Sequence, residues 1–365
     1  MMREIRAAVL RTAKAPFSIE SAKLDAPRAD EVLVELVATG ICHSDVAIVE
    51  QILPLPLPLV LGHEGAGIVR EVGAAVTNVT VGDHVVLGFA SCGACRECVG
   101  GHPAYCDLAG ALNFGMRRQD GSVVIYDEKS QPLNASFFGQ SSFATHSVVR
   151  AHNVVKMRRD IPLKLLGPLG CGFMTGAGTM LNVMKPERES RVAIFGAGAV
   201  GFAALFAARL MGCRRIVVVD RVKSRLELAR ELGATDIINT AESNLDEALA
   251  AFGGLNRAMD TTGVPSVIES AVRALRIRGM LVLVGASHEQ KFSTDILHMI
   301  SGRVIMGAVE GDSVPTTFIP FLADKFMRGE FPIDRLSAFY AFDQINTAVA
   351  DGTSGKTIKP ILTFQ

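Results

Sequence analysis

A glycine-rich turn between two apolar runs constrains the fold of this chain more than any other feature. The segment Arg191–Asp220 reads RVAIFGAGAVGFAALFAARLMGCRRIVVVD, which predicts a strand, a tight turn, a helix of small residues and a second strand that ends in an acid. The turn contains Gly196, Gly198 and Gly201 in the spacing G-x-G-x-x-G. In this fingerprint the first glycine makes the turn, the second lets the backbone approach a pyrophosphate, and the third lets the helix pack closely on the strand. The segment therefore predicts a dinucleotide-binding βαβ unit within an α/β fold.

The residues that follow the turn indicate which dinucleotide would bind. The predicted helix starts at Ala199 and Val200, where free N–H groups and the positive end of the helix dipole would favour phosphates. Asp220 can accept hydrogen bonds from a ribose 2′-hydroxyl and would repel a 2′-phosphate, so NAD is favoured over NADP. The basic residues Arg221 and Arg225 weaken this preference.

The same segment has an alternative interpretation as a membrane span, because Val192–Ala208 carries no charge. The run is shorter than the ~20 apolar residues that a span needs, and its glycines cluster in a turn pattern. Arg209 follows at once. We interpret the run as a buried strand and helix.

Composition narrows the possible functions. A chain of 365 residues is long enough for two domains with full cores. Lys and Arg together number 37, as do Asp and Glu, so nothing indicates electrostatic binding to nucleic acid or anionic lipid. No secretion-signal pattern is visible at the N-terminus, and the seven cysteines are an odd number. We expect a cytoplasmic protein whose cysteines bind metal rather than form disulfides.

The two halves of the chain predict different architectures. The N-terminal half alternates short apolar runs with turns and has no helical period, which predicts a compact β-rich body. After the fingerprint, strands and helices alternate, which predicts a parallel sheet with helices on both faces. Gly355–Phe364 resembles a final strand that rejoins the N-terminal body. We expect one β-rich domain from residues 1–171 and 309–365, and an inserted nucleotide-binding domain at 172–308.

Four cysteines at close spacing predict a structural zinc site. Cys92, Cys95, Cys98 and Cys106 follow the pattern C-x2-C-x2-C-x7-C in a loop that contains glycine. Four soft ligands so arranged are typical of a closed site that stabilises a loop without a core of its own. An iron–sulfur cluster is the alternative, but its bacterial pattern has three residues before the last cysteine, which is followed by proline. His102 lies in the last gap and could replace a cysteine, although a surface position explains it better.

Three separate loops contain residues that could bind a second metal ion. The loops read GICHSD, LGHEGAG and GPLGCG, and they supply Cys42, His63 and Cys171. Two thiolates and one imidazole would provide three ligands for tetrahedral zinc and leave the fourth position open for water or substrate. Taken singly, each cysteine is better explained as a buried apolar thiol and His63 as a loop or core histidine. The sequence alone does not show that the three converge.

Taken together and in order, these motifs resemble those of the zinc-dependent, medium-chain alcohol dehydrogenases. CHSD, GHEGAG, the four-cysteine loop, GPLGCGFMTGAG, IFGAGAVG and KTIKPILTF extend from about residue 5 to the C-terminus. The stretches FFGQSSFATH, LLGPLGCG and FIP…GEFPIDRL look most like the bacterial aryl- and terpene-alcohol dehydrogenases, of the benzyl alcohol and geraniol types. The resemblance implies a Rossmann doubly wound parallel sheet inserted in a β-rich, GroES-like catalytic domain.

The resemblance also implies a role for each site residue. The three separated ligands would hold the catalytic zinc, with Glu64 as an occasional or alternate ligand. Asp45 would accept a hydrogen bond from the ring of His63, and Ser44 would hydrogen-bond the alcohol oxygen. Further residues would bind the cofactor beside the glycine turn: His43 and Lys359 at the pyrophosphate, Thr175 and Val284 at the nicotinamide, Asp220 and Arg225 at the adenosine ribose. The substrate channel would be lined by Leu53, Phe89 and Phe143.

One position departs from the family pattern. Many members have a histidine five residues after the first zinc cysteine, where it ends a proton relay to solvent. This chain has Ala47 there. Either Ser44 and the ribose hydroxyl pass the proton directly to water, or another group replaces the histidine.

The activity implied by the resemblance is the reversible, NAD-dependent oxidation of a primary aromatic or allylic alcohol to the aldehyde, with one catalytic and one structural zinc ion per subunit. A homodimer or homotetramer is also implied, in which the strand Val304–Val309 could pair edge to edge with its copy. One alternative is a glutathione-dependent formaldehyde dehydrogenase, whose channel would be polar and basic, whereas Leu53–Leu59 is apolar. The other, from a different class, is a non-catalytic NAD-binding protein on the same fold. The intact set of metal ligands argues against it.

Overall fold

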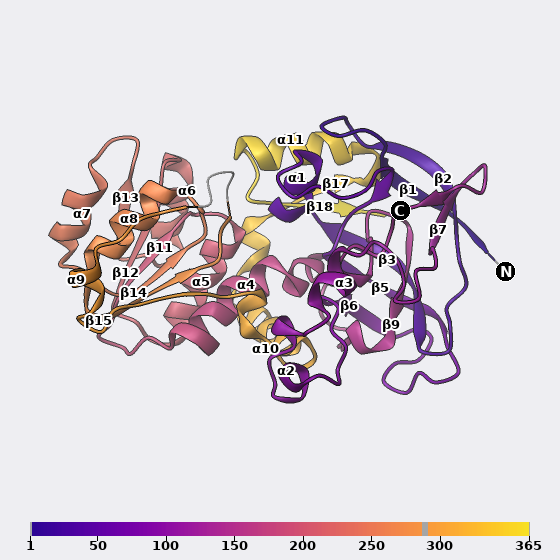
Figure 1. Ribbon diagram of the computed structural model, residues 1–365, viewed down its shortest axis with the longest axis horizontal. Coiled ribbons are helices and arrows are strands. Elements are labelled where there is room, and N and C mark those ends of the chain that lie inside the picture. The colour runs from indigo at the N-terminus through magenta and orange to yellow at the C-terminus, as the bar shows by residue number, and fades with distance from the viewer. Residues whose placement is uncertain (1, 287–290, 365) are drawn as a thin grey trace. The chain divides into compact units, whose positions relative to one another are not determined.

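The computed structural model describes residues 2–286 and 291–364, and the chain divides into two compact units (Figure 1). The first unit is formed by Met1–Cys171, Val314–Gly329 and Ile333–Gln365, and the second by Gly172–Ser313 and Glu330–Pro332. The compact units thus divide after residues 171 and 313, where the sequence led us to expect domain boundaries after 171 and 308. The assignment of these units as domains stays a proposal.

The second unit contains a parallel sheet with the strand order β13-β12-β11-β14-β15-β16. Its strands are β11 (Arg191–Phe195), β12 (Arg215–Asp220), β13 (Asp236–Asn239), β14 (Leu255–Asp260), β15 (Leu275–Leu283) and β16 (Val304–Gly307). Its helices are α4 (Gly172–Gly178), α5 (Ala199–Leu210), α6 (Lys223–Glu231), α7 (Leu245–Phe252), α8 (Pro265–Ala274) and α9 (Ile296–Met299). This strand order is that of the doubly wound dinucleotide-binding fold. In that fold the first three strands are added toward one edge of the sheet and the later strands toward the other, so the strand order reverses beside the first strand.

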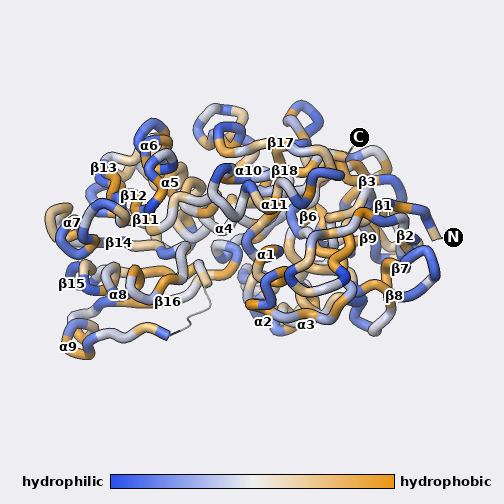
Figure 2. Tube along the Cα trace, turned by 90° about the horizontal axis from the view of Figure 1, so that it is seen from above, coloured by the Kyte–Doolittle hydropathy of each residue, from blue (hydrophilic) through white to orange (hydrophobic). Residues whose placement is uncertain are grey.

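Two helices that connect strands of this sheet differ in how many of their residues are buried, in line with their composition. Helix α5 consists of small and apolar residues, and every residue from Gly201 to Ala208 is buried. Helix α6 is mostly charged and buries only Leu226 and Ala229. Figure 2 shows the hydrophilic character of α6 at the edge of this unit. The uncharged run 192–208 is therefore a buried strand, turn and helix, and no helix among the described residues is long and apolar enough to cross a membrane.

The first unit contains two mostly antiparallel sheets among its described residues, with the orders β4-β1-β2-β7-β8 and β10-β6-β5-β3-β18-β17, and β9 also pairs with β3. The strands are β1 (Arg3–Leu10), β2 (Ser18–Leu24), β3 (Glu31–Gly40), β4 (Leu59–Val60), β5 (Gly65–Val72), β6 (His84–Leu87), β7 (Ile125–Asp127), β8 (Pro132–Leu133), β9 (His146–Arg150), β10 (Val154–Met157), β17 (Ser337–Ala341) and β18 (Lys359–Thr363). The helices are α1 (His43–Val49), α2 (Arg96–Val99), α3 (Ala109–Phe114), α10 (Pro315–Met327) and α11 (Ile345–Ser354).

Strand β3 organises this unit and places the functional loops. It is almost entirely buried and pairs with β5, β9 and β18. Its pairing with β18 confirms that the C-terminal strand rejoins the N-terminal body. Because β3 ends at Gly40 and β5 begins at Gly65 directly opposite Thr39, the residues just outside these strand ends, Cys42 and His63, are brought to the same edge of the sheet.

Candidate active site and metal centres

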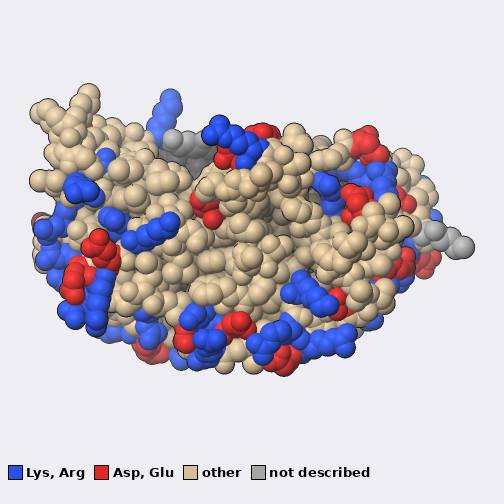
Figure 3. Space-filling view, turned by 90° about the horizontal axis from the view of Figure 1, so that it is seen from below, with Lys and Arg blue, Asp and Glu red and all other residues tan. Residues whose placement is uncertain are grey.

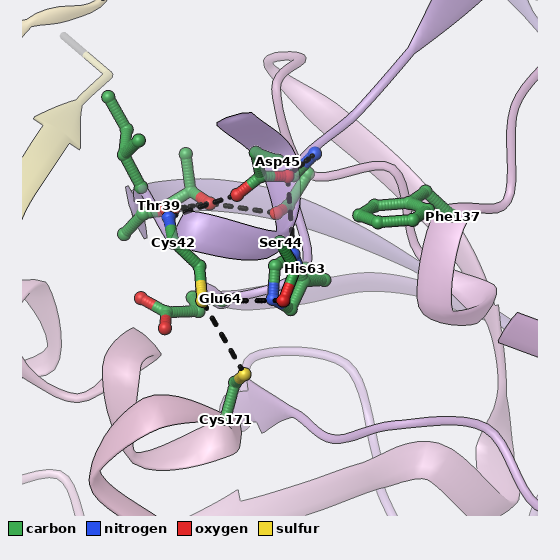
Figure 4. Close-up of polar contacts among 12 residues, drawn as sticks. Thr39, Cys42, Ser44, Asp45, His63, Glu64, Phe137 and Cys171 are labelled. Atoms are coloured by element: carbon green, nitrogen blue, oxygen red, sulfur yellow. Dashed lines mark hydrogen bonds and ion pairs between the residues drawn. The ribbon is translucent and has the colours of Figure 1, made fainter. Parts of the chain in front are cut away.

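Four side chains from three separate segments of the chain meet at this edge. The ligand atoms of Cys42, His63, Glu64 and Cys171 lie within 4.8 Å of one another, as Figure 4 shows. The two sulfur atoms are 4.0 Å apart. Two sulfur ligands of a tetrahedral zinc ion, each at about 2.3 Å from the metal, lie about 3.8 Å apart. The spacing of the two thiols therefore fits a shared zinc ion.

The imidazole of His63 supplies the strongest indication of a metal. Its Nδ1 lies 3.2 Å from Oδ1 of Asp45, which fixes this nitrogen as the donor. Its Nε2 is buried and has no hydrogen-bond partner among the described residues. A buried acceptor without a partner is costly, and a metal ion would satisfy it. Together with the two sulfurs, this nitrogen makes a donor set that suits zinc.

Asp45 forms hydrogen bonds with both the Cys42 segment and the His63 segment. It lies in the first turn of α1 and is only 1% exposed. Its Oδ2 accepts a hydrogen bond from the backbone of Cys42 at 3.0 Å, while Oδ1 accepts from His63 and from the backbone of Gly62 at 3.0 Å. One carboxylate thus orients the backbone of one ligand and the ring of another.

We expect Asp45→Asn to weaken zinc binding at this cluster by about tenfold to a hundredfold, because an amide holds the imidazole ring and its tautomer less firmly than a carboxylate does. The measurement is competition with a zinc chelator, read as metal retained per chain. Glu50→Gln, at the exposed C-terminal end of α1, is the matched control. Equal zinc retention in the two variants would contradict the orienting role.

A buried ion pair adjoins the candidate metal ligands. Nζ of Lys359 contacts Oε1 and Oε2 of Glu64 at 2.8 and 2.9 Å and the carbonyl oxygen of Ile41 at 3.1 Å. Burial opposes the charge of Lys359, but the neighbouring Glu64 carboxylate outweighs it and raises the pKa of the amine. Lys359, expected at a pyrophosphate, is thus held by Glu64 and a carbonyl in this structure. The pair also fixes the carboxylate of Glu64 next to the thiols and His63.

Helix α1 places three further predicted residues around Cys42. Oγ of Ser44 lies 3.7 Å from Sγ of Cys42 and is half-buried. His43, at the start of the helix, is exposed. Ala47 follows one turn later and is also half-buried. Ser44 is therefore the hydroxyl nearest to the metal cluster on this helix, in a position that solvent reaches.

The three residues expected to line a substrate channel lie in different environments. Leu53 is 45% exposed, Phe89 is buried, and Phe143 is completely buried. Phe143 packs against the ring of Phe17 in the hydrophobic core, with their centroids 5.8 Å apart. The described structure thus brings Phe143 into the core, and its channel contact stays a prediction.

Other aromatic residues pack against the candidate metal ligand His63. The ring of Phe138 stacks on the imidazole at a centroid distance of 4.5 Å, and Phe137 contacts it edge-on at 5.2 Å. Phe114 packs against both phenylalanines. In the sequence, the stretch FFGQSSFATH served only as part of the family resemblance, and no role at His63 was assigned to Phe137 or Phe138. The doublet of phenylalanines before a glycine was the available signal.

Residues 136–141, which we call the aromatic turn, hold these rings in place. Phe138 has a φ of 50°, a left-handed conformation that is strained for an aromatic residue. Oγ of Ser141 accepts hydrogen bonds from the backbone of Ser136 and Phe137 at 2.8 and 2.9 Å. The side chain of Gln140 donates to the carbonyl of His63 at 2.9 Å. The turn is therefore bonded directly to the segment that carries the metal ligand.

The four-cysteine loop forms a second cluster in the same unit. The sulfur atoms of Cys92, Cys95, Cys98 and Cys106 lie within 4.8 Å of one another. The backbone N–H groups of Ala94 and Cys95 donate to the sulfur of Cys92 and lower its pKa to about 6. Such N–H donors stabilise thiolates, the form that binds zinc. His102, the possible substitute ligand, is exposed and lies outside the cluster.

The glycine turn of the second unit has the shape that its motif predicts. Gly196 has a φ of +99°, and a side chain there would meet Oγ1 of Thr261. A Cβ at Gly201 would lie 1.9 Å from the carbonyl oxygen of Gly196, so only glycine lets the helix approach. A Cβ at Gly198 would meet no described atom within 4 Å. Because Gly198 has no side chain to cap α5, this side of the turn is open for a phosphate group at the helix start.

Asp220 ends β12 beside this turn. Its Oδ2 accepts from the backbone of Ala197 at 2.7 Å, and its Oδ1 accepts from Val222 at 2.8 Å. The carboxylate is thus oriented by the glycine turn itself. The other residues expected at the cofactor are placed as follows: Thr175 is buried and donates to Glu310 at 3.1 Å, Arg225 is half-buried on α6, and Val284 is half-buried and donates its backbone N–H to Asp260 at 2.9 Å.

Comparison with known proteins identifies the family of this chain. Residues 28–159 match the alcohol dehydrogenase GroES-like domain, and residues 199–324 match the zinc-binding dehydrogenase domain. These matches define the class as a zinc-binding dehydrogenase with a GroES-like domain and confirm the predicted fold. More specifically, the chain belongs to the zinc-dependent, medium-chain alcohol dehydrogenase family.

Similar proteins cover the whole chain. Geraniol dehydrogenase of Castellaniella defragrans is 43% identical over 98% of this chain and 97% of its own length. Among solved structures, a zinc-binding alcohol dehydrogenase domain protein of Burkholderia ambifaria has 49% identity and a TM-score of 0.98, with full coverage of both chains. Benzyl alcohol dehydrogenase of Acinetobacter calcoaceticus has 43% identity and a TM-score of 0.96, also with full coverage of both.

Proposed function

We propose that this protein is a zinc- and NAD-dependent dehydrogenase that reversibly oxidises a primary aromatic or allylic alcohol to the aldehyde. The observation that carries the proposal is the convergence of Cys42, His63 and Cys171, with Nε2 of His63 buried and without a hydrogen-bond partner among the described residues. Three ligands of this kind leave one position of a tetrahedral metal for substrate, as a catalytic site requires.

Residues of the first unit have separate roles in removing the alcohol proton. Zinc, when bound, supplies a Lewis acid that favours loss of the alcohol proton. The Ser44 hydroxyl accepts that proton as it passes its own proton on to solvent, because it lies beside Cys42 and is partly open to solvent. Asp45 keeps His63 in one tautomer, and Lys359 holds the carboxylate of Glu64 in reach of the cluster.

The residues of the second unit hold the cofactor. NAD, when bound, supplies the hydride acceptor. The open face at Gly198 and the first N–H groups of α5 bind its pyrophosphate, and Asp220 binds the adenosine ribose. Thr175 and Val284 flank the nicotinamide, and Arg225 assists at the ribose.

The preference for aromatic and allylic alcohols is supported by two observations. Phe138 stacks on His63 and is only half-buried, and aromatic surfaces favour unsaturated substrates by stacking. The similar proteins include dehydrogenases named for geraniol and for benzyl alcohol. We infer a primary allylic or aromatic alcohol as the substrate of this chain.

Initial rates with NAD test this proposal. We expect benzyl, cinnamyl and geranyl alcohol to be oxidised with much higher kcat/KM than ethanol or propanol. Equal values for ethanol and benzyl alcohol would contradict the substrate preference. No NADH formation from any of these alcohols by zinc-loaded protein would contradict the activity itself.

We expect Ala47→His to raise the oxidation rate at mildly acidic pH, because an imidazole at this position of α1 provides a relay that accepts the proton near its ordinary pKa of about 6.5. The measurement is kcat against pH. Ala47→Asn, which adds a polar side chain that does not titrate, is the matched control. An unchanged pH profile in Ala47→His would count against a missing relay.

We expect Asp220→Asn to shift the ratio of kcat/KM for NADP over NAD upward by about tenfold to a hundredfold. The substitution removes the charge that repels a 2′-phosphate and weakens a charge-assisted hydrogen bond to the ribose. Asp236→Asn, a partly exposed acid on the neighbouring strand β13, is the control. A ratio that does not change in Asp220→Asn would contradict the ribose assignment.

A further inference from the structure

A cavity in the first unit lies away from the metal ligands and has no part in the proposed reaction. Its volume is about 250 Å³, and its wall includes Arg117, Asn153, Leu112, Val124, Val148 and Gly139. We call it the arginine pocket. None of the metal ligands described above lines it. The arginine pocket is therefore a candidate site for a different ligand.

The charges around the arginine pocket leave one cation without an anionic partner. The ion pairs among its lining residues are Arg28–Asp120 at 2.8 Å, Arg118–Glu31 at 2.8 Å and Arg150–Asp30 at 3.4 Å. Arg117 is half-buried, donates to the side-chain oxygen of Asn134 at 3.0 Å, and forms no ion pair with any described residue. Its guanidinium retains donors and a positive charge, which a carboxylate would match in shape and sign.

A buried amide in the same pocket also lacks partners. Asn153 is only 5% exposed, and neither its Oδ1 nor its Nδ2 has a hydrogen-bond partner among the described residues. An unpartnered buried amide costs about 1–3 kcal/mol, so such groups normally serve a bound molecule or water. Together with Arg117, it offers an additional donor to an anion in the pocket.

Besides these ion-paired residues, part of the wall is apolar and can contact the body of a ligand. Leu112, Val124 and Val148 are buried hydrophobic residues. An apolar cavity of about 150 Å³ accommodates a benzene ring, so a cavity of about 250 Å³ has room for a ring together with a carboxylate. We propose that the arginine pocket binds a small monocarboxylate with an apolar body, with its carboxylate on Arg117.

Such a ligand would affect the position of His63 through the aromatic turn. Ser136 and Gly139, which line the arginine pocket, belong to the aromatic turn. From the same turn, Phe138 stacks on His63 and Gln140 binds its carbonyl. A ligand that packs against Ser136 and Gly139 therefore stabilises the turn that positions His63, and it changes kcat without competing with the alcohol.

Benzoate, with uncharged benzamide as its isosteric control, tests the proposal on the zinc-loaded full chain. We expect benzoate to raise the thermal midpoint in a concentration-dependent way, and Arg117→Gln to weaken benzoate binding by about tenfold to a hundredfold in calorimetry. Benzamide should have little effect. Arg70→Gln, an exposed arginine paired with Glu35 elsewhere in the unit, should bind benzoate as the wild type does.

A second variant covers the case in which Arg117→Gln folds poorly. Asn153→Leu replaces the unpartnered amide with an apolar side chain, so it should raise the thermal midpoint of the free protein and weaken its response to benzoate. Benzoate binding that is equal in the wild type and in both variants, or matched by benzamide, would overturn the proposal. Binding that competes with the alcohol and persists in Arg117→Gln would assign benzoate to the metal site instead. These binding readouts do not depend on alcohol oxidation.

Discussion

Replacing Cys171 with serine is expected to abolish alcohol oxidation while leaving the fold intact. The substitution removes one of two thiolates whose sulfur atoms lie 4.0 Å apart, and a serine hydroxyl is a poor zinc ligand. Loss of a Lewis acid worth several kcal/mol of transition-state stabilisation lowers kcat by about a thousandfold or more. The measurements are kcat with benzyl alcohol and zinc content per chain.

Cys213→Ser is the matched control for this experiment. Cys213 is also buried, but it lies outside both clusters, and its sulfur donates a hydrogen bond to the backbone carbonyl of Glu187, 3.8 Å away. It tests the same chemical change without a ligand role. Full activity in Cys171→Ser, or an equal loss in Cys213→Ser, would contradict the assignment of Cys171 as a ligand.

Among the substitutions proposed in this protein, replacing Cys106 with serine is expected to lower the thermal stability most. The four-cysteine loop has a small core of its own, in which Ala90, Cys106 and Leu112 are buried. Zinc binding therefore supplies most of the free energy that holds the loop. If the substitution costs about 3 kcal/mol, the thermal midpoint falls by about 4 °C for a chain of this size.

Calorimetry of the zinc-loaded chain measures this effect, and Cys213→Ser again serves as the control. A chelator should lower the midpoint of the wild type toward that of Cys106→Ser, because both remove the same ion. A midpoint in Cys106→Ser within about 1 °C of the control would show that the loop is stabilised by its packing rather than by metal.

The nucleotide-binding half was predictable because its signal is local. The fingerprint, its strand and its helix all lie within Arg191–Asp220, and the φ of Gly196 and the crowding at Gly201 follow from that spacing. The four-cysteine cluster is equally local, since its ligands fall within one loop. The structure brings both motifs to the geometry that their spacing requires.

The metal site of the first unit could not be derived from spacing alone, because 129 residues separate Cys42 from Cys171. Their meeting depends on the register of β3 with β5, which is tertiary information. The resemblance to a known family supplied it. The same limit applies to Lys359, whose contact with Glu64 depends on the return of β18 to β3.

The geometry of the aromatic turn and the unpaired groups of the arginine pocket could not be predicted from the sequence. Phe138 reaches His63 only because its backbone is left-handed, which the composition FFGQSSF does not indicate. Arg117 and Asn153 are an ordinary arginine and asparagine in the sequence, and their unmatched charge and amide become visible only when their neighbours are placed.

The surface agrees with a small-molecule enzyme rather than a binder of polyanions. Lys and Arg are interspersed with Asp and Glu on the face shown in Figure 3, as the equal totals of 37 suggest.

The central claim is that this chain carries a catalytic zinc site in addition to a structural one. The most direct test is the zinc content of the purified wild-type protein after dialysis against metal-free buffer, determined by elemental analysis per chain. The account predicts two zinc ions per chain, falling to one in Cys171→Ser together with loss of activity. A single zinc ion in the wild type, unchanged in Cys171→Ser, would contradict it and indicate a protein that binds NAD without catalysis.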